Sequence, residues 1–271
     1  MKLKIVQLLI FLLLTGCNPA VDAPPNSKST TVITAPSNTP LNATADNLPI
    51  PNNSENNQYA ILFIGNSHVL GLSVILRELL QKGVPQKNLG QIVVNTGDYL
   101  ADRLDDGRSL ETLQNNDWSH AIFQAQKYSQ SGSFEYPTTG AQTWIQYAKA
   151  QNTTPILFPE HPQRNNKIEG TMVHNLHVSI AKKQASCVAP VGLVWDRVIA
   201  LRPNLALYQE DGNHASNLGR FLTALVFYEI ISGQPADLLP YISNADADLI
   251  IQDFMGQIVT EVIAANPPCE Y

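Results

Sequence analysis

Residues 60–71, with the sequence AILFIGNSHVLG, constrain the fold of this chain more than any other stretch. Residues 60–64 are apolar without alternation, which predicts a strand buried on both faces of a parallel sheet. Residues 69–80 then repeat apolar side chains at helical spacing, and Gly83 is a suitable C-cap. Ser67 lies in the turn between them, at the sheet edge where open α/β folds bind ligands. Ser67 is therefore a candidate nucleophile, with a role as the helix N-cap as the alternative.

Strands and helices are expected to alternate along the rest of the chain. Short apolar runs predict further strands at residues 91–95, 119–124, 155–158 and 187–191. Helical spacing of apolar residues predicts helices at residues 139–151, 171–183, 195–201, 217–231 and 245–264. Strands that alternate with helices at these lengths form a doubly wound sheet with helices on both faces. We predict an α/β, flavodoxin-like fold: a mostly parallel five-stranded sheet in a three-layer sandwich.

The N-terminal residues have the pattern of a bacterial lipoprotein signal. Lys2 and Lys4 precede an apolar run, residues 5–14, which is too short to span a bilayer as a folded helix. Small residues then precede Cys17, as in a lipobox, where the cysteine is lipidated and becomes the new N-terminus. We predict a signal peptide at residues 1–16 and a membrane anchor through lipid on Cys17, in the bacterial cell envelope and facing the periplasm or exterior. An ordinary secretory peptide is the alternative.

Residues 17–57 are expected to form a disordered tether. They consist mainly of Pro, Ser, Thr, Asn and Ala, a composition that buries too little apolar surface to become ordered. Residues 58–271 are predicted to form one domain with a single large core. Removal of residues 1–16 would leave 15 basic and 23 acidic residues, which argues against binding of nucleic acid. We expect a monomer.

Cys187 and Cys269 are the two cysteines outside the lipobox. In an exported protein such a pair can oxidise to a disulfide, which would tie the C-terminal tail to the domain. Cys187 lies in an apolar stretch, so a buried free thiol is the alternative.

Asp211 and His214 form a second candidate for chemistry, three residues apart in the loop before the helix at residues 217–231. At this spacing the carboxylate can accept a hydrogen bond from the imidazole Nδ1–H, which leaves Nε2 free to take a proton. Such a base needs a nucleophile from another strand end, and Ser67 is the candidate. Without Ser67, a surface turn would be the simpler interpretation.

Taken together, these segments resemble the sequence blocks of the SGNH, or GDSL, hydrolases. Residues 65–68 (GNSH) are similar to the first block, with Asn66 where the family commonly has Asp. Gly97 is similar to the glycine of the second block, and residues 211–214 (DGNH) match the fourth block, Asp-x-x-His. The third block departs from the family, because Gly-x-Asn is replaced by residues 124–126 (QAQ).

The resemblance implies a serine esterase that works through an acyl-enzyme and needs no cofactor or metal. Ser67 would attack an ester carbonyl, His214 would accept its proton, and Asp211 would steady the imidazolium.

The resemblance also implies an oxyanion hole, built from the N–H groups of Ser67 and Gly97 and a side-chain amide of the third block. Gln126 aligns with the family's asparagine and offers the same donor on a longer stem. Gln124, which aligns with the family's glycine, is the alternative donor.

The sequence does not determine which ester is the substrate. A small-molecule or polysaccharide ester is expected, and an extracytoplasmic location favours O-acetyl groups on carbohydrate or other envelope esters. An O-acetyltransferase for an envelope polysaccharide and a non-catalytic glycan-binding module on the same fold are the alternatives, and the second is favoured by Gln126.

Several other polar and aromatic residues remain open to two interpretations. Glu160 and His161 either line the cleft or belong to a solvated loop, and His174 and His177 share a helix face without a metal-site motif such as HExxH. Three aromatic residues either form a sugar-stacking wall or pack in the core: Tyr128, Tyr136 and Trp144.

Overall fold

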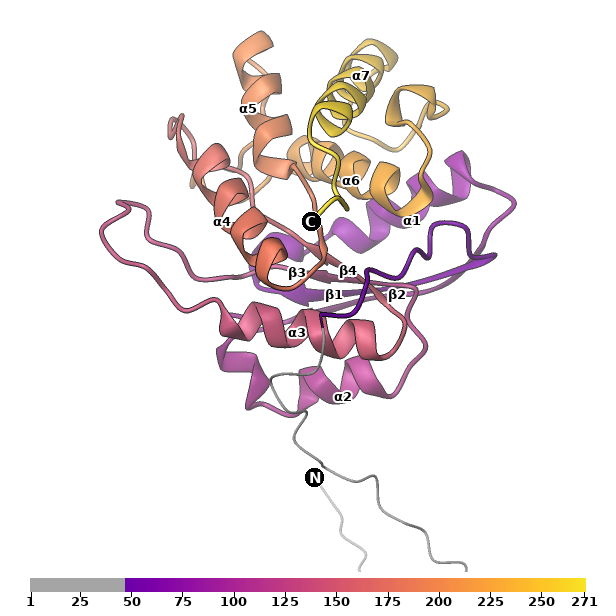
Figure 1. The fold of residues 1–271 in the computed structure, drawn as a ribbon. Helices are drawn as coiled ribbons and strands as arrows, with labels where there is room; N and C mark the ends of the chain where they lie inside the picture. The colour runs from indigo at the N-terminus through magenta and orange to yellow at the C-terminus, as the bar shows by residue number, and fades with distance from the viewer. Residues whose placement is uncertain (1–46) are drawn as a thin grey trace, which may run out of the picture. The chain divides into compact units, whose positions relative to one another are not determined.

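A five-stranded sheet forms the middle layer of the computed structural model, which describes residues 47–271 (Figure 1). Its strands are β1 (Gln58–Gly65), β2 (Asn88–Thr96), β3 (His120–Phe123), β4 (Thr154–Leu157) and β5 (Cys187–Val188). The strand order is β2-β1-β3-β4-β5, and every neighbouring pair is parallel. This is the flavodoxin-like order. The predicted α/β fold is therefore confirmed.

Helices cover both faces of the sheet. They are α1 (Leu72–Gly83), α2 (Arg108–Gln114), α3 (Thr139–Ala150), α4 (Glu169–Lys183), α5 (Val191–Leu201), α6 (Asn217–Ser232) and α7 (Leu249–Ala265). Three short 3-10 helices accompany them: η1 (Ser67–Val69), η2 (Asp102–Leu104) and η3 (Ala236–Leu238). Within residues 47–271, none of the helices combines the length and the apolar character needed to cross a membrane.

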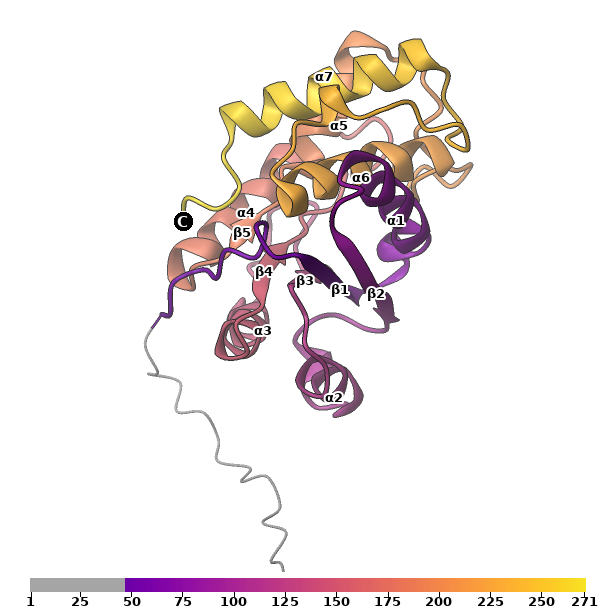
Figure 2. The same ribbon diagram turned by 90° about the vertical axis from the view of Figure 1, so that its right-hand side faces the viewer.

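The position of strand β1 explains why its sequence does not alternate apolar with polar residues. Tyr59, Ile61 and Phe63 pack into one core with residues of α1, α5, α6 and α7. Ala60, Leu62 and Ile64 point to the opposite face and pack with residues of α2, α3 and α4. Figure 2 shows the sheet between α1, α5, α6 and α7 on one side and α2 and α3 on the other. Both faces of the central strand are therefore buried, as an apolar run without polar positions requires.

Local boundaries differ from the prediction where short elements meet. Helix α2 was not predicted, because its seven residues contain only two apolar side chains. Helix α5 begins at Val191 directly after Pro190, which shortens the predicted strand at residues 187–191 to Cys187–Val188. Proline fits the start of a helix because the first N–H groups of a helix lack intrahelical acceptors.

The predicted tether ends earlier than residue 57, because residues 47–57 pack against the domain. Asn53 is buried, and its side-chain amide donates to the carbonyls of Ser119 and Asn152, both at 2.8 Å. The Lys149 ammonium likewise donates to the Asn47 side-chain oxygen at 2.8 Å. Polar asparagines thus satisfy groups at the amino ends of the strands, a stabilisation that composition alone does not reveal. Residues 1–46, including Cys17, lie outside the described residues.

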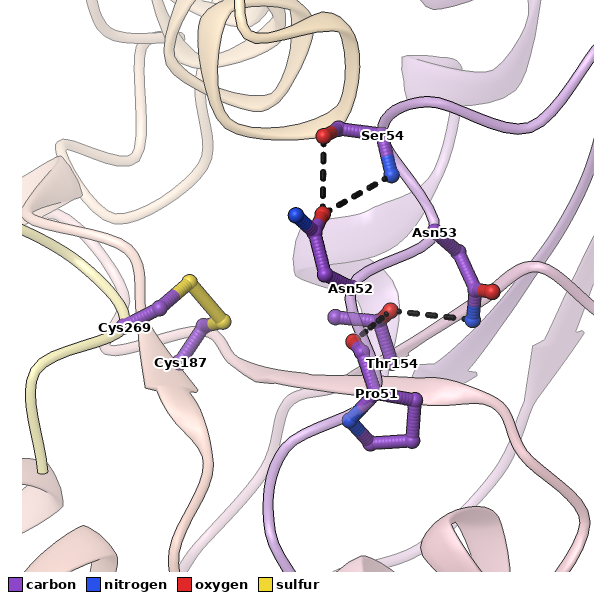
Figure 3. The surroundings of a disulfide bond; sticks show 7 residues. All are labelled: Pro51, Asn52, Asn53, Ser54, Thr154, Cys187 and Cys269. Atoms are coloured by element: carbon purple, nitrogen blue, oxygen red, sulfur yellow. Dashed lines mark hydrogen bonds between the residues drawn. A yellow bond between two sulfur atoms is a disulfide. The ribbon is translucent and has the colours of Figure 1, made fainter.

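Cys187 and Cys269 are joined by a disulfide, with sulfur atoms 2.01 Å apart (Figure 3). The Val188 N–H also donates to the Pro268 carbonyl at 2.7 Å. The C-terminal tail is therefore tied to the edge strand β5 by a covalent bond and a hydrogen bond. Figure 3 also shows Asn53 of the N-terminal segment donating to the Thr154 hydroxyl at 3.1 Å.

Candidate active site

Ser67 lies in the nucleophile turn, the name used here for residues 65–68 at the carboxyl end of β1. The Asn66 side chain caps the 3-10 helix η1 by accepting the His68 N–H at 3.0 Å. Helix α1 begins only at Leu72, after Gly71 in the left-handed region with φ of 81°. Ser67 is therefore not the N-cap of α1, and its side chain is exposed to solvent.

The buried side chain of Gln124 supports the nucleophile turn by hydrogen bonds. Its Oε1 accepts the Asn66 N–H at 2.8 Å. Its Nε2 donates to Glu160 Oε2 at 2.5 Å. A Cβ on Gly65 would lie 2.6 Å from Gln124 Oε1, so this close approach requires glycine. One buried amide thus links the carboxyl ends of β1, β3 and β4.

The structure brings together the three residues of the predicted triad. Ser67 Oγ lies 2.8 Å from His214 Nε2, and His214 Nδ1 lies 2.5 Å from Asp211 Oδ2. Asp211 Oδ1 also accepts the N–H groups of Asn213 and His214, each at 2.9 Å. The hydrogen bond from the His214 side chain, followed by these backbone bonds, holds the pKa of Asp211 well below its usual range. An ionised Asp211 fixes the proton of His214 on Nδ1 and leaves Nε2 to accept one from Ser67.

Asp211 and His214 belong to the catalytic loop, defined here as residues 208–216, which a neighbouring loop supports. The Arg164 N–H donates to the Gly212 carbonyl at 2.8 Å, and its guanidinium donates to the Gln209 carbonyl. The same guanidinium lies 5.5 Å from the ring centre of Tyr208. Gln163 Nε2 adds a bond to Asn213 Oδ1 at 3.3 Å. The Arg164 guanidinium also donates to the Glu210 carbonyl at 3.5 Å, so Arg164 contacts four positions of the catalytic loop.

A column of rings lies behind His214. The rings of His68 and His214 stack, with centroids 5.2 Å apart and planes inclined by 22°. His161 meets His68 edge-on at 5.2 Å and meets the buried Trp195 at 4.0 Å. Burial lowers the pKa of His68, against an opposing effect of Glu160, and burial lowers the pKa of His161 well below its usual value. Burial therefore favours the neutral form of both imidazoles, and His161 is a packing residue rather than part of a solvated loop.

The predicted oxyanion hole is the part of the site where the structure differs most from expectation. The Gly97 N–H donates to the Gly65 carbonyl at 2.9 Å, as a continuation of the sheet. Gln126 Nε2 donates to the carbonyls of Lys127 at 2.9 Å and Pro137 at 3.2 Å. Gln124 is committed to the nucleophile turn, so neither glutamine amide faces Ser67 as a free donor.

The Ser67 N–H is the predicted oxyanion donor that remains available, because it has no hydrogen-bond partner among residues 47–271. Ala125 follows β3 with φ of 77°, a left-handed conformation that is uncommon for a residue with a side chain. Such backbone strain clusters at functional sites. The third block is thus a strained turn beside Ser67 rather than a side-chain donor to it.

Ser67 and His214 open into a cleft of about 730 Å³ with predominantly polar walls. Tyr128 and Tyr136 of the predicted aromatic wall line this cleft, as does Glu160. Trp144 does not, because it is fully buried and its indole N–H donates to the Leu100 carbonyl at 2.8 Å. No group of three His, Cys, Asp or Glu side chains in the described part of the chain is arranged to hold a metal ion.

Several solved structures have a similar arrangement of strands and helices. A protein from Slackia heliotrinireducens described as an SGNH hydrolase is 22% identical, with a TM-score of 0.51 over 64% of this chain and 99% of that one. The fold is that of the SGNH hydrolases. A DUF4886 family protein from Bacteroides uniformis is 13% identical, with a TM-score of 0.61 over 78% of this chain and 96% of its own.

A variant of an acetyl xylan esterase from Geobacillus stearothermophilus is also similar in fold, at 15% identity and a TM-score of 0.51 over 69% of this chain and 97% of that one. No protein-family model and no curated protein matches the sequence. The likeness therefore concerns the fold, and the chemistry must be argued from the site.

The sequence predicted Ser67, Asp211 and His214, which the structure brings together, and it gave Glu160 as a possible cleft residue, but it did not indicate the supporting contacts of Arg164 and His68. Arg164 follows β4 and His68 follows Ser67, so their position after strand ends was the available signal. Their partners lie on other loops, and sequence spacing does not reveal such pairs. His174 and His177 are buried on α4, where the His177 Nδ1–H donates to the Val173 carbonyl at 2.8 Å.

Proposed function

We propose that this protein is a serine esterase that hydrolyses short-chain esters of carbohydrate, foremost O-acetyl groups. The observation that carries the proposal is the hydrogen-bonded chain from Ser67 Oγ through His214 to Asp211, open to a cleft. Nucleophile, base and orienting carboxylate within hydrogen-bond reach are the requirements for nucleophilic catalysis. The polar walls suit a hydroxyl-rich alcohol better than a long acyl chain, and the similarity in fold to an acetyl xylan esterase supports the same substrate class.

The mechanism follows from the positions of these groups. Ser67 Oγ bonds to the ester carbonyl carbon while its proton passes to His214 Nε2, and the Ser67 N–H donates to the developing oxyanion. The carbon–oxygen bond to the sugar then breaks, and the sugar oxygen takes the proton from His214. Water attacks the acyl-serine, again giving its proton to His214, which returns it to Ser67 Oγ as the acid is released. Asp211 stays ionised throughout and stabilises the imidazolium.

We further propose that the enzyme is extracytoplasmic and anchored by lipid on Cys17. The lipobox pattern supports this location, and the Cys187–Cys269 disulfide fits an oxidising compartment. A Cys17→Ser variant should then lose its partition into the detergent phase. Unchanged partitioning of that variant would end the anchoring proposal.

The test of the activity is acetate release by the full chain from acetylated polysaccharides and from short and long aryl esters, with Ser67→Ala as the matched control. We expect release from short esters, and labelling of the wild type but not of Ser67→Ala by a fluorophosphonate. A wild type that neither labels nor releases acetate would be a non-catalytic module. Transfer of the acetyl group to an added sugar acceptor, in preference to water, would identify an acetyltransferase.

A further inference from the structure

A second hollow, of about 610 Å³, adjoins the catalytic cleft. The two hollows share Lys127, Tyr128, Ser129 and Tyr136 in their walls. All four residues belong to the segment between β3 and α3, which therefore borders both hollows. Ser67 lines the first hollow and residues of helix α4 line the second. A ligand longer than one sugar unit bound at Ser67 can extend along this segment into the second hollow.

The rim of the second hollow presents two aromatic rings to solvent. Phe134 is 60% exposed and Tyr136 is 39% exposed, and their rings meet edge-on with centroids 4.7 Å apart. Two exposed aromatic rings in contact at the edge of a hollow are of the kind that lines ligand-binding pockets. Such rings offer flat apolar faces for the C–H faces of sugars, and Tyr136 adds a hydroxyl.

The segment that carries these rings is held at both ends. Gln126 Nε2 donates to the carbonyls of Lys127 and Pro137, which closes the segment at its base. The Tyr128 hydroxyl donates to the buried carboxylate of Glu169 on α4 at 2.9 Å. Gln126, the residue at which the chain departs from the SGNH pattern, thus supports a wall of the groove instead of an oxyanion.

The chemistry of the second hollow suits uncharged sugar units. Met172, Val173 and Leu176 of α4 give it an apolar wall, and Thr138 and Gln142 add neutral polar groups. Its charged lining residues are Lys127, which is paired with Asp102 at 3.0 Å, and Glu135 and Lys183, which carry opposite charges. Apolar surface with a few neutral hydrogen-bonding groups is the composition of a small-molecule site.

We propose that the second hollow is a subsite for a polymeric glycan, whose acetylated unit lies at Ser67 and whose neighbouring neutral sugar units stack on Phe134 and Tyr136. This inference rests on the proposed function, because it assigns the direction in which the substrate of that site continues. It makes an acetylated polysaccharide or long oligosaccharide the preferred substrate, rather than a single acetylated sugar.

The test uses acetylated oligomers of xylose, mannose and N-acetylglucosamine, from one to six units, with the full chain. For at least one series, kcat/KM should rise with length relative to p-nitrophenyl acetate, by about fivefold to tenfold. Phe134→Ala should abolish that rise. Tyr241→Ala, which removes a 48% exposed tyrosine outside both hollows, is the matched control and should retain it.

Binding to the Ser67→Ala protein, measured by calorimetry, provides a readout that does not depend on turnover. Six-unit oligomers should bind Ser67→Ala more tightly than one-unit sugars, and Phe134→Ala in the same background should remove the difference. Hydrolysis of aryl acetates and acetylated monosaccharides without any gain with length, in rate or in binding, overturns the subsite and leaves the esterase standing. Absence of hydrolysis together with length-dependent binding would overturn the esterase and support the subsite.

Discussion

The two sides of the candidate active site are positioned in different ways. The nucleophile turn follows the central strand, where the Gly65 carbonyl accepts from the Gly97 N–H and from the buried Arg103 guanidinium, both at 2.9 Å. The catalytic loop contains no fully buried residue, and Arg164 and Gln163 hold it from another loop. The sheet thus fixes Ser67, whereas surface hydrogen bonds fix His214. Changes beneath Ser67 should therefore reduce stability and activity together, and changes around His214 should reduce activity alone.

The largest expected effect tests whether both sides act as one unit. Ser67→Ala and His214→Ala should each lower kcat/KM for an aryl acetate by at least about a thousandfold, because each removes a participant in proton transfer. The double variant should be no slower than either single variant, with unchanged thermal midpoints throughout. Effects that multiply in the double variant would mean that Ser67 and His214 do not act in one step.

The second prediction concerns the support beneath Ser67. Gln124→Ala should lower kcat by roughly tenfold to a hundredfold, because the nucleophile turn loses its buried acceptor. The same change should reduce the free energy of unfolding by about 1–3 kcal/mol, since it leaves the Asn66 N–H and Glu160 with unmade hydrogen bonds. Denaturant titration and steady-state kinetics measure the two quantities, with the exposed Gln91→Ala as control.

Gln126→Ala provides the contrast within the same third block. Its amide supports residues 127–137, so the substitution should raise KM for glycan esters more than it lowers kcat. If Gln126→Ala greatly lowered kcat while Gln124→Ala left kcat unchanged, Gln126 would have the oxyanion role that the family resemblance implies.

The same contrast explains what the sequence can and cannot predict. The sequence predicted the buried strand at residues 60–64 and the pairing of Asp211 with His214. Both could be predicted because strand burial and a three-residue turn are local properties of the chain. The roles of Gln124 and Gln126 could not be predicted, because they depend on which backbone carbonyl or N–H group lies next to each side chain after folding. Asn53 was assigned to a disordered tether for the same reason, since its partners are 66 and 99 residues away.

The third prediction concerns the support of the catalytic loop. Arg164→Ala should lower kcat about fivefold to tenfold with little change in the thermal midpoint, because the lost bonds are exposed. Arg164→Lys should recover only part of the rate, since an ammonium cannot reproduce the planar fork of guanidinium. Arg197→Ala, an exposed arginine on α5, is the control. A fall in stability as large as that of Gln124→Ala would contradict the distinction between the two sides.

The smallest expected effect lies where the two sides touch, at the stacked rings of His68 and His214. A neutral ring against the imidazolium that forms on His214 stabilises it by about 0.5–1 kcal/mol, so His68→Ala should lower kcat roughly twofold to fivefold at pH 8. His68→Phe keeps an aromatic face and should stay closer to the wild-type rate. Equal losses in both variants would show that a nitrogen of His68, rather than its ring face, is required.

The pH dependence of these variants separates stacking from charge. Burial lowers the pKa of His68 below its usual value, so this side chain is neutral at pH 7–8 and takes a proton only as the pH falls. A positive charge there opposes formation of the imidazolium on His214, whose ring centre is 5.2 Å away. The wild-type rate should therefore fall more steeply below about pH 6.5 than the rate of His68→Phe, which cannot be protonated. If the kcat–pH profiles of the wild type and His68→Phe coincided at acid pH, protonation of His68 would have no effect on the catalytic loop.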